Sequence, residues 1–178
     1  MKMYHFAAAG VFCLLLSVGS NVNAQSLNKA FSVGFGLEGG LAGGSANSNY
    51  HSMGGLSIRF SYHVGPGFVT LGTGAFAWVP KSFEGKTTKA SLQIPVLAGY
   101  KFIFARHLFV MGELGYSSFR VYYNGGNGDV ASTNYGGFTY APSFGINFNA
   151  LELGIRYQAT SLSGATLSAV GLRLAFNF

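Results

Sequence analysis

Seven charged side chains sit at positions that alternate with apolar residues, and together they could form ion pairs. They are Glu38, Arg59, Lys101, Glu113, Glu152, Arg156 and Arg173. If they share one buried face, each needs an opposite charge, because an unpartnered ion in a narrow interior is strongly destabilising. We therefore expect a network of salt bridges, with a proton or ion path as the alternative. A first loop centred near residues 47–49 would place Glu38 beside Arg59.

Other groups that could do chemistry are few. His51, with Ser48 or Ser52 nearby, could serve a hydrolase or acyltransferase, but no acidic partner is evident. Residues 34–39 spell G-x-G-x-x-G, yet no helix follows that could hold a phosphate. Residues 124–129 offer a single carboxylate, too few for calcium. We expect no catalytic residue, no cofactor and no metal, and the chain is predicted not to be an enzyme.

The first 24 residues are predicted to be a cleaved signal peptide. Lys2 supplies a positive charge, residues 6–18 form an apolar run, and a small-residue cleavage pattern ends at Ala24. Cys13 lies inside the apolar run without the preceding small pair of a lipoprotein signal, so it is expected to leave with the peptide. Residues 25–178 would then form one exported domain without cysteine.

The composition is unusual for a soluble protein. Only 9% of the 178 residues are charged, 49% are hydrophobic, 16% are aromatic, and 27 are glycine. A typical soluble domain has about 25% charged residues. So much glycine disfavours long helices, and so much apolar residue disfavours disorder. These values favour a β-rich chain with too little charge for an exterior in water.

Alternation with a period of two residues predicts eight strands. They are expected over residues 31–41, 56–63, 69–79, 90–102, 108–117, 138–148, 151–158 and 170–178. The connections at 64–67, 103–107 and 148–150 are tight, whereas those at 42–52, 80–88, 123–134 and 160–166 are longer and more polar. An even number of strands closes an antiparallel barrel, and short turns opposite long loops are typical of outer-membrane barrels.

Composition also indicates which face points outward. One face of the strands carries Leu, Ile, Val, Phe and Tyr, and the other carries Gly, Ser, Thr, Asn and the few charges. A soluble lipocalin-like barrel would turn its apolar face inward and would need many charges outside. An apolar face in contact with lipid needs no charged residues, and a closed barrel satisfies every backbone polar group. We therefore predict an all-β fold, an eight-stranded antiparallel up-and-down transmembrane barrel with a filled lumen.

Aromatic residues are expected to form two girdles at the membrane interfaces. The set near the short turns is Tyr62, Phe68, Tyr100, Phe102, Phe148, Phe176 and Phe178; the set near the long loops is Trp78, Tyr116, Tyr122, Tyr135, Phe138, Tyr140 and Tyr157.

Three segments resemble the PorT-like family of outer-membrane β-barrels. These are residues 91–102 (Ser-Leu-Gln-Ile-Pro-Val-Leu-Ala-Gly-Tyr-Lys-Phe), residues 109–116 and residues 151–157. Within the first, Pro95 is expected to sit in a bulge. The end of the chain resembles the signal that assembly machinery reads in outer-membrane barrels, carried by Val170, Leu172, Leu174, Phe176 and Phe178. The resemblance implies an outer-membrane location and, for the named family member, service in protein secretion.

The expected function is a structural or interaction role through the extracellular loops. The alternatives are a component of a secretion or transport assembly and, less favoured, a lipid-modifying enzyme at the rim. Lys81, Lys86 and Lys89 share one loop and could contact lipopolysaccharide phosphates or an acidic partner; the plainer interpretation is a solvated loop. The expected partners are membrane lipid, lipopolysaccharide, the barrel-assembly machinery and an envelope protein. Nucleic acid is not expected.

Overall fold

The computed structural model describes residues 30–81, 90–124, 130–148, 150–162 and 165–178. The predicted signal peptide with Cys13, as well as Lys86 and Lys89, lies outside the described residues. No helix among those described is both long and apolar enough to cross a membrane.

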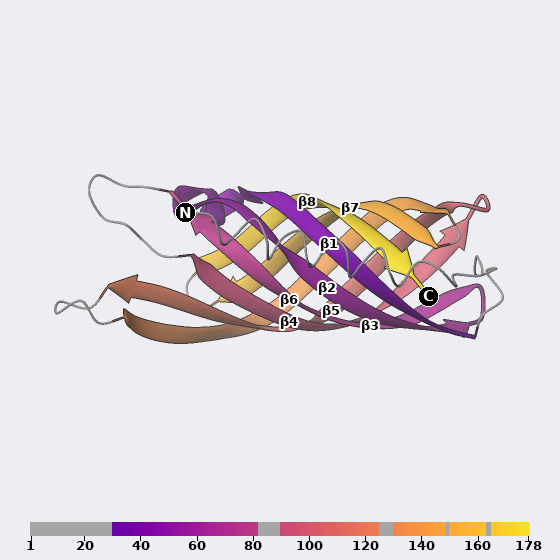
Figure 1. Cartoon of the computed structure of the whole chain (residues 1–178), viewed down its shortest axis with the longest axis horizontal. Helices are drawn as coiled ribbons and strands as arrows, with labels where there is room; N and C mark the ends of the chain where they lie inside the picture. The colour runs from indigo at the N-terminus through magenta and orange to yellow at the C-terminus, as the bar shows by residue number, and fades with distance from the viewer. Residues whose placement is uncertain (1–29, 82–89, 125–129, 149, 163–164) are drawn as a thin grey trace, which may run out of the picture.

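Eight antiparallel strands form a closed barrel in the order β1 to β8, which confirms the predicted fold class (Figure 1). The strands are β1 (Phe31–Gly43), β2 (Tyr50–Val64), β3 (Gly67–Pro80), β4 (Ser91–Phe104), β5 (Leu108–Asn124), β6 (Val130–Phe148), β7 (Leu151–Leu162) and β8 (Ala165–Asn177). Each strand pairs with its neighbours in sequence, and β1 pairs with β8. Closure leaves no sheet edge along the body of the barrel.

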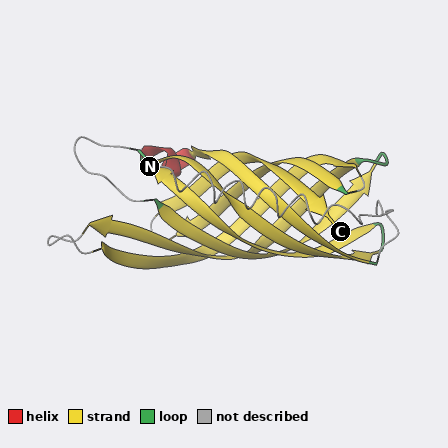
Figure 2. Ribbon diagram, in the orientation of Figure 1, coloured by secondary structure: helices red, strands yellow, loops and turns green. Residues whose placement is uncertain are grey.

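The two ends of the barrel differ, as the loop pattern predicts. Tight turns join β2 to β3, β4 to β5 and β6 to β7 at the end where the chain finishes. At the other end a short 3-10 helix, η2 (Gly44–Ser48), follows β1 (Figure 2). The strands at this end are longer than predicted. Residues 121–124 of β5 pair only with residues 130–133 of β6, and this end of the β5–β6 hairpin extends beyond the rest of the barrel (Figure 1).

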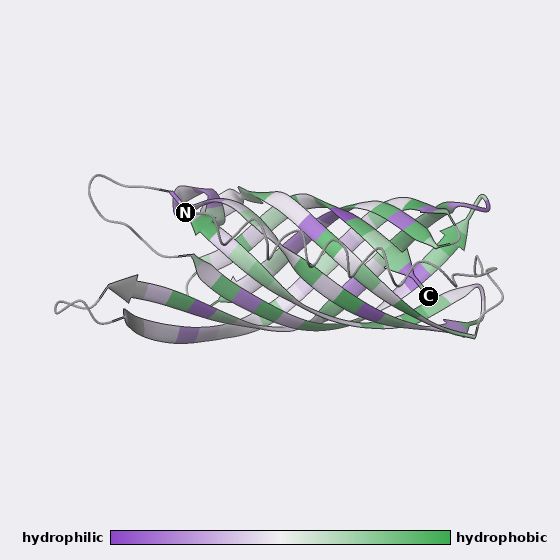
Figure 3. Ribbon diagram, viewed as in Figure 1, coloured by the Kyte–Doolittle hydropathy of each residue, from purple (hydrophilic) through white to green (hydrophobic). Residues whose placement is uncertain are grey.

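Exposed and buried residues alternate along the strands, as side chains that point in turn to the outside and to the lumen would. Hydrophobic and less hydrophobic residues likewise alternate along the ribbon (Figure 3). The outward positions are largely apolar and exposed, for example Leu37, Leu41, Leu56, Leu71, Val96, Leu114, Phe144, Ile155, Leu172 and Phe176. The lumen is filled by glycine, by hydroxyl and amide side chains, by the charged residues and by a few large apolar side chains. The apolar face therefore points outward.

Two predicted girdle residues, Trp78 and Phe68, point inward, so their assignment is wrong. Trp78 is 1% exposed and Phe68 is 8% exposed. They lie on the same face of β3 as Phe76. The outward face carries small residues such as Ala75 and Ala77, so the alternation of large apolar residues does not mark it as the apolar face. The other described girdle aromatics are exposed or half-buried, and all but Tyr135 lie at outward positions of their strands. Tyr135 is exposed but has inward parity, because it pairs with the inward Phe119 across the β5–β6 ladder.

Pro95 lies in β4 without a bulge, which corrects the expectation from sequence. The β3–β4 register runs from Thr73↔Val96 to Phe76↔Gln93 without a shift, although the two pairs between them are missing. The hydroxyl of Thr73 donates to the carbonyl oxygen of Pro95 at 2.8 Å. The β3–β4 ladder is therefore interrupted at Pro95, which lacks a backbone N–H, and the Thr73 hydroxyl satisfies the Pro95 carbonyl oxygen.

The seam between β1 and β8 is closed along its length. Ten residue pairs join the strands, from Gly34↔Asn177 to Gly43↔Ser168. Beyond them, Val33 and Phe178 exchange two backbone hydrogen bonds, at 3.1 and 2.8 Å. The seam therefore extends to Phe178, whose ring lies edge-on to Phe35 with the centroids 6.1 Å apart.

Candidate functional site: an ion ring inside the barrel

All seven charged residues singled out from the sequence lie in the lumen. They come from β1 (Glu38), β2 (Arg59), β4 (Lys101), β5 (Glu113), β7 (Glu152 and Arg156) and β8 (Arg173). None is more than 7% exposed. Strand alternation turns each of them inward, and the small inward residues around them leave room for long side chains.

Three glutamates and three arginines form a closed ring of alternating charge. Going round it, the ion-pair distances are 3.1 Å for Arg173–Glu38, 3.4 Å for Glu38–Arg156, 3.1 Å for Arg156–Glu113, 3.3 Å for Glu113–Arg59 and 2.8 Å for Arg59–Glu152. The sixth pair, Glu152–Arg173, closes the ring. We call these six residues the ion ring. Four of its six links join strands that are not neighbours, so the ring braces the barrel across its interior.

The expected pairing of Glu38 with Arg59 does not occur. Across the β1–β2 ladder Glu38 faces Gly55, and Arg59 faces Gly34. Glu38 instead pairs with Arg156 and Arg173 and accepts a 2.6 Å hydrogen bond from Ser57. The expectation failed because the β1–β2 ladder is centred between residues 46 and 47, earlier than the expected residues 47–49, and this moves the partner of Glu38 by four residues, from Arg59 to Gly55.

Lys101 is the seventh member and stands beside the ring. Its ammonium lies 2.8 Å from Glu152. It also lies 5.6 Å from the ring centroid of Phe68 and 5.4 Å from that of Phe109. These distances are within the range of cation–π attraction. Because Phe68 points inward, its ring provides one of the two cation–π contacts of the buried Lys101.

A layer of uncharged polar groups lies between the ion ring and the loop end. Gln93 accepts from Trp78 Nε1 at 2.9 Å and donates to Thr160 at 2.9 Å. Thr160 contacts Thr139 at 2.8 Å, which contacts Ser117 at 2.6 Å. Strand parity places these residues inward, but their partners come from five strands, and no short motif marks them in the sequence.

An apolar cluster closes the lumen near the loop end. It contains Ala42, Ala46, Met53, Phe76, Trp78, Phe119, Leu167 and Ala169, with Tyr50, Val121 and Leu162 packed against it. Tyr50, Trp78 and Phe119 meet edge-on, with centroids 5.7 to 6.3 Å apart. Three successive layers of side chains therefore fill the described interior: ionic, polar and apolar.

The other residues selected from the sequence are scattered over the barrel. Lys81 donates to the side chain of Asn47 at 2.9 Å. His51 is exposed at the start of β2, and no hydrogen bond joins it to Ser48 or Ser52 within the described chain. The residues in the described ranges hold no group of three His, Cys, Asp or Glu side chains that could bind a metal.

The residues of the proposed assembly signal all lie along β8 or just after it. Val170, Leu172, Leu174 and Phe176 are 40 to 59% exposed on the outer face. Phe178 is half-buried against β1. The structure thus presents them as one outward apolar row.

Several solved structures share this fold. The N-terminal β-barrel domain of Pseudomonas aeruginosa OprF matches with a TM-score of 0.61 and 14% identity over 83% of this chain and 97% of that one. The Yersinia pestis outer membrane protein Ail, solved in a phospholipid bilayer nanodisc, also matches, as does Neisserial surface protein A. For Ail in the nanodisc the TM-score is 0.56 at 14% identity, covering 83% and 98% of the two chains. For the neisserial protein it is 0.54 at 14% identity, covering 84% and 98%.

These similarities define the class of fold as that of small eight-stranded barrels such as OprF, Ail and NspA. No protein-family model and no curated protein matches the chain. The resemblance of three strands to the PorT-like family therefore stays an expectation drawn from short motifs.

Proposed function

We propose that this chain is an integral protein of the bacterial outer membrane, with a closed lumen and a structural or interaction role at its loop end. One observation carries the proposal: large apolar side chains point outward on all eight strands, while seven of the charged residues lie buried in the lumen. Such a surface in water would far exceed the apolar patch of a few hundred Å² that soluble monomers tolerate. In lipid the same surface is favourable, and the closed ladder satisfies the backbone.

The similar structures support this location. Ail is described as an outer membrane protein, and its structure was obtained in a lipid bilayer. At the low identities found, the likeness concerns the fold, and we infer the membrane location from the outward apolar face of this chain. Export through the predicted signal peptide, with cleavage after Ala24, is the matching route.

Cell fractionation followed by gel electrophoresis tests the location. The folded barrel is expected in the outer-membrane fraction and should migrate differently in detergent before and after boiling. Changing outward Leu37 to Arg should lower the amount of this folded form, because an arginine at the bilayer midplane costs about 2–4 kcal/mol. Recovery of the native protein from the soluble periplasmic fraction would contradict the proposal.

The three filled layers support a lumen that is closed to solutes. A barrel of eight strands has an interior just wide enough for side chains to fill. In planar bilayers, protein shown to be inserted by its heat-modifiable migration is expected to give no large, steady current. Such currents would contradict the closed lumen and would favour the transport alternative.

The loop end is the proposed contact surface. Lys81, together with Lys86 and Lys89 of the same loop, would meet lipopolysaccharide phosphates or an acidic envelope partner. Replacing all three lysines with Gln is expected to weaken retention of the barrel on immobilised lipopolysaccharide at low salt. Lys101→Gln does not serve as a control, because Lys101 is buried in the lumen. Arg106→Gln, at the opposite end, is the matched control. Equal retention of the two variants would contradict the proposed contact between these lysines and lipopolysaccharide.

The two alternatives from the sequence have their own tests. Stable co-purification with a secretion complex would favour the assembly role over a stand-alone one. A rim enzyme would need His51. Because we expect no enzymatic activity, His51→Ala should leave the lipid A profile unchanged. Loss of a lipid A modification in that variant would overturn the expectation that the chain is not an enzyme.

A further inference from the structure

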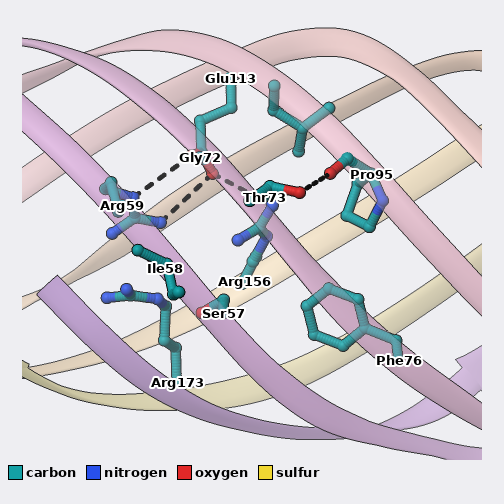
Figure 4. A pocket seen from close by; sticks show the side chains of 11 residues that line it. Ser57, Ile58, Arg59, Gly72, Thr73, Phe76, Pro95, Glu113, Arg156 and Arg173 are labelled. Carbon is teal, nitrogen blue, oxygen red and sulfur yellow. Dashed lines mark hydrogen bonds and ion pairs between the residues drawn. The ribbon is translucent and has the colours of Figure 1, made fainter.

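The described interior of the barrel has no room for a ligand of ordinary size. A cavity lies against the ion ring, and Arg59, Glu113 and Arg156 are among the residues that line it (Figure 4). Its volume is about 10 Å³, the lower limit for a single water molecule. The ionic, polar and apolar layers fill the rest of the described lumen. A binding site on this barrel therefore has to lie on its outer face or at its ends.

Arg120 is the only charged side chain that the described strands place on their outer face. The other charged residues of these strands are the seven in the lumen, and Lys81 and Arg106 lie outside the strands. Arg120 is exposed and lies on the same face of β5 as Leu114 and Tyr116. A cation on the lipid-facing wall is costly at the bilayer midplane and nearly free of cost at the interface. Its height on the barrel therefore decides what it can do.

The outer wall changes from apolar to polar just below Arg120. Towards the loop end, the outward pairs of the β5–β6 ladder are Tyr116↔Phe138, Ser118↔Gly136 and Arg120↔Asn134. A Cβ atom at Gly136 would overlap the Tyr116 hydroxyl, so this ring leans towards the loop end. Two residues of a tilted strand advance about 5 Å along the membrane normal. Arg120 thus lies about one headgroup layer beyond the girdle hydroxyl.

The guanidinium group of Arg120 is oriented but not fully used. Its Nε donates to Asn134 Oδ1 at 2.8 Å, and its terminal nitrogens Nη1 and Nη2 donate to no described residue. The amide nitrogen of Asn134 adds a further donor. The three glutamates of the described chain are all buried in the lumen, so no described acidic side chain neutralises Arg120. The pair offers an anion a guanidinium fork, whose geometry matches phosphate oxygens.

The apolar residues below Arg120 narrow the class of ligand. Tyr116 and Phe138 are 60% and 54% exposed, and Ile94, which faces Ser118 across the β4–β5 ladder, is 45% exposed. A lipid that carries a phosphate can contact this apolar wall and the guanidinium group together. A soluble acidic protein would meet only the cation. At the loop end of an outer-membrane barrel, the phosphorylated lipid of the outer leaflet is lipid A.

We propose that Arg120 and Asn134 bind a phosphate group of lipid A on the outer wall of β5 and β6. Asn134 orients the guanidinium group, and Nη1 and Nη2 pair with phosphate oxygens. Tyr116 and Phe138 pack against the acyl chains of the same lipid. This inference rests on the proposed outer-membrane location, and it concerns the wall of the barrel rather than the lysine-bearing loop.

Native mass spectrometry of the barrel refolded in detergent gives the direct test. Lipid A with two phosphates competes for the protein with the same lipid after dephosphorylation, and heat-modifiable migration verifies that the protein is folded. The native barrel is expected to bind the phosphorylated lipid at least about fivefold more tightly. Equal binding of the two lipids would overturn the proposal. So would displacement of lipid A by an equal concentration of inorganic phosphate or phosphatidylglycerol, because the site would then not select lipid A.

Three variants locate the site on the barrel. Arg120→Gln removes the charge and should abolish the preference for the phosphorylated lipid. Asn134→Asp keeps the shape of the side chain and supplies Arg120 with a carboxylate, so it should lower the preference without loss of the folded band. Arg106→Gln removes an exposed arginine at the opposite end and should keep the preference. An unchanged preference in Arg120→Gln, or an equal loss in Arg106→Gln, would refute the site.

The binding experiment is independent of the location of the protein in the cell. If fractionation finds the folded barrel in the outer membrane but Arg120→Gln binds lipid A as the native protein does, only this inference fails. Recovery of the native protein from the soluble periplasm would instead contradict the proposed location, whatever the binding result.

Discussion

Glu38 of β1 and Arg173 of β8 face each other as Cα partners across the seam that closes the barrel, and their side chains form an ion pair at 3.1 Å. The same two residues belong to the ion ring, which also reaches β2, β5 and β7. The seam is thus fixed twice, by the backbone ladder and by buried charges. A slip of one residue would turn Glu38 outward and break both.

Neutralising Glu38 should destabilise the barrel strongly. Glu38→Gln removes the carboxylate that pairs with Arg156 and Arg173 and leaves two buried cations short of an anion. The expected loss is about 3–5 kcal/mol in the free energy of unfolding, measured by urea titration in detergent. Ser57→Ala, which removes only a hydrogen bond to the same carboxylate, should cost about 1.5–3 kcal/mol. A Glu38→Gln protein as stable as the native one would show that the ring does not brace the barrel.

A methyl group at Gly145 should be poorly tolerated. It would approach Gly154 Cα at 2.6 Å and Phe109 Cε1 at 2.8 Å, where the Phe109 ring packs over two facing glycines. Overpacking of this kind costs about 1–3 kcal/mol. Gly112→Ala, whose added methyl points outward into open space, should stay within about 0.5 kcal/mol of the native protein. Equal urea midpoints for the two variants would contradict the tight packing.

The turn between β4 and β5 carries backbone strain that glycine should relieve. Ala105 and Arg106 adopt φ values of 48° and 67°, in the left-handed region that disfavours residues with a Cβ atom. Replacing either with glycine is expected to raise the free energy of unfolding by up to about 1 kcal/mol. Pro66→Gly, in the neighbouring turn between β2 and β3, should not stabilise, since it adds freedom to the unfolded chain. A loss of stability in Ala105→Gly would count against the strained turn.

The faces of the strands were predictable from sequence where large apolar residues alternate with small or charged ones. β1, β7 and β8 show this clearly, and their charged residues lie inside. On β3 the outward row includes the small residues Thr73, Ala75 and Ala77, whereas the inward row carries Phe68, Phe76 and Trp78, so the pattern does not show which face is outward. The outer ends of β2 and β6 are not predictable in this way, because Gly, Ser and Asn interrupt the alternating pattern there.

Which charges meet was not predictable. A register error of four residues separated Glu38 from Arg59, and alternation alone does not fix the tilt of the strands. Links such as Arg156–Glu113 cross the lumen between strands that are distant in sequence. The sequence therefore indicates that buried ions must pair, but the ring itself becomes visible only once the barrel is closed.

Removal of Phe178 should separate assembly in the cell from folding in the test tube. The residue exchanges two backbone hydrogen bonds with Val33, a small part of the seam, so refolding into detergent should be little affected. If Phe178 also serves as the proposed assembly signal, the amount in the outer membrane should fall several-fold. Phe178→Tyr, which keeps an aromatic ring, is the control. Unchanged surface levels without Phe178 would contradict that signal.

Quenching of tryptophan fluorescence by brominated lipid chains tests most directly whether the apolar face meets lipid and the lumen does not. The single tryptophan, Trp78, is 1% exposed inside the barrel, whereas Leu174 is 40% exposed on the outer face. In bilayers, native Trp78 should be weakly quenched, and a tryptophan introduced by Leu174→Trp in a Trp78→Phe background should be strongly quenched. Strong quenching of Trp78, or none at position 174, would contradict the account.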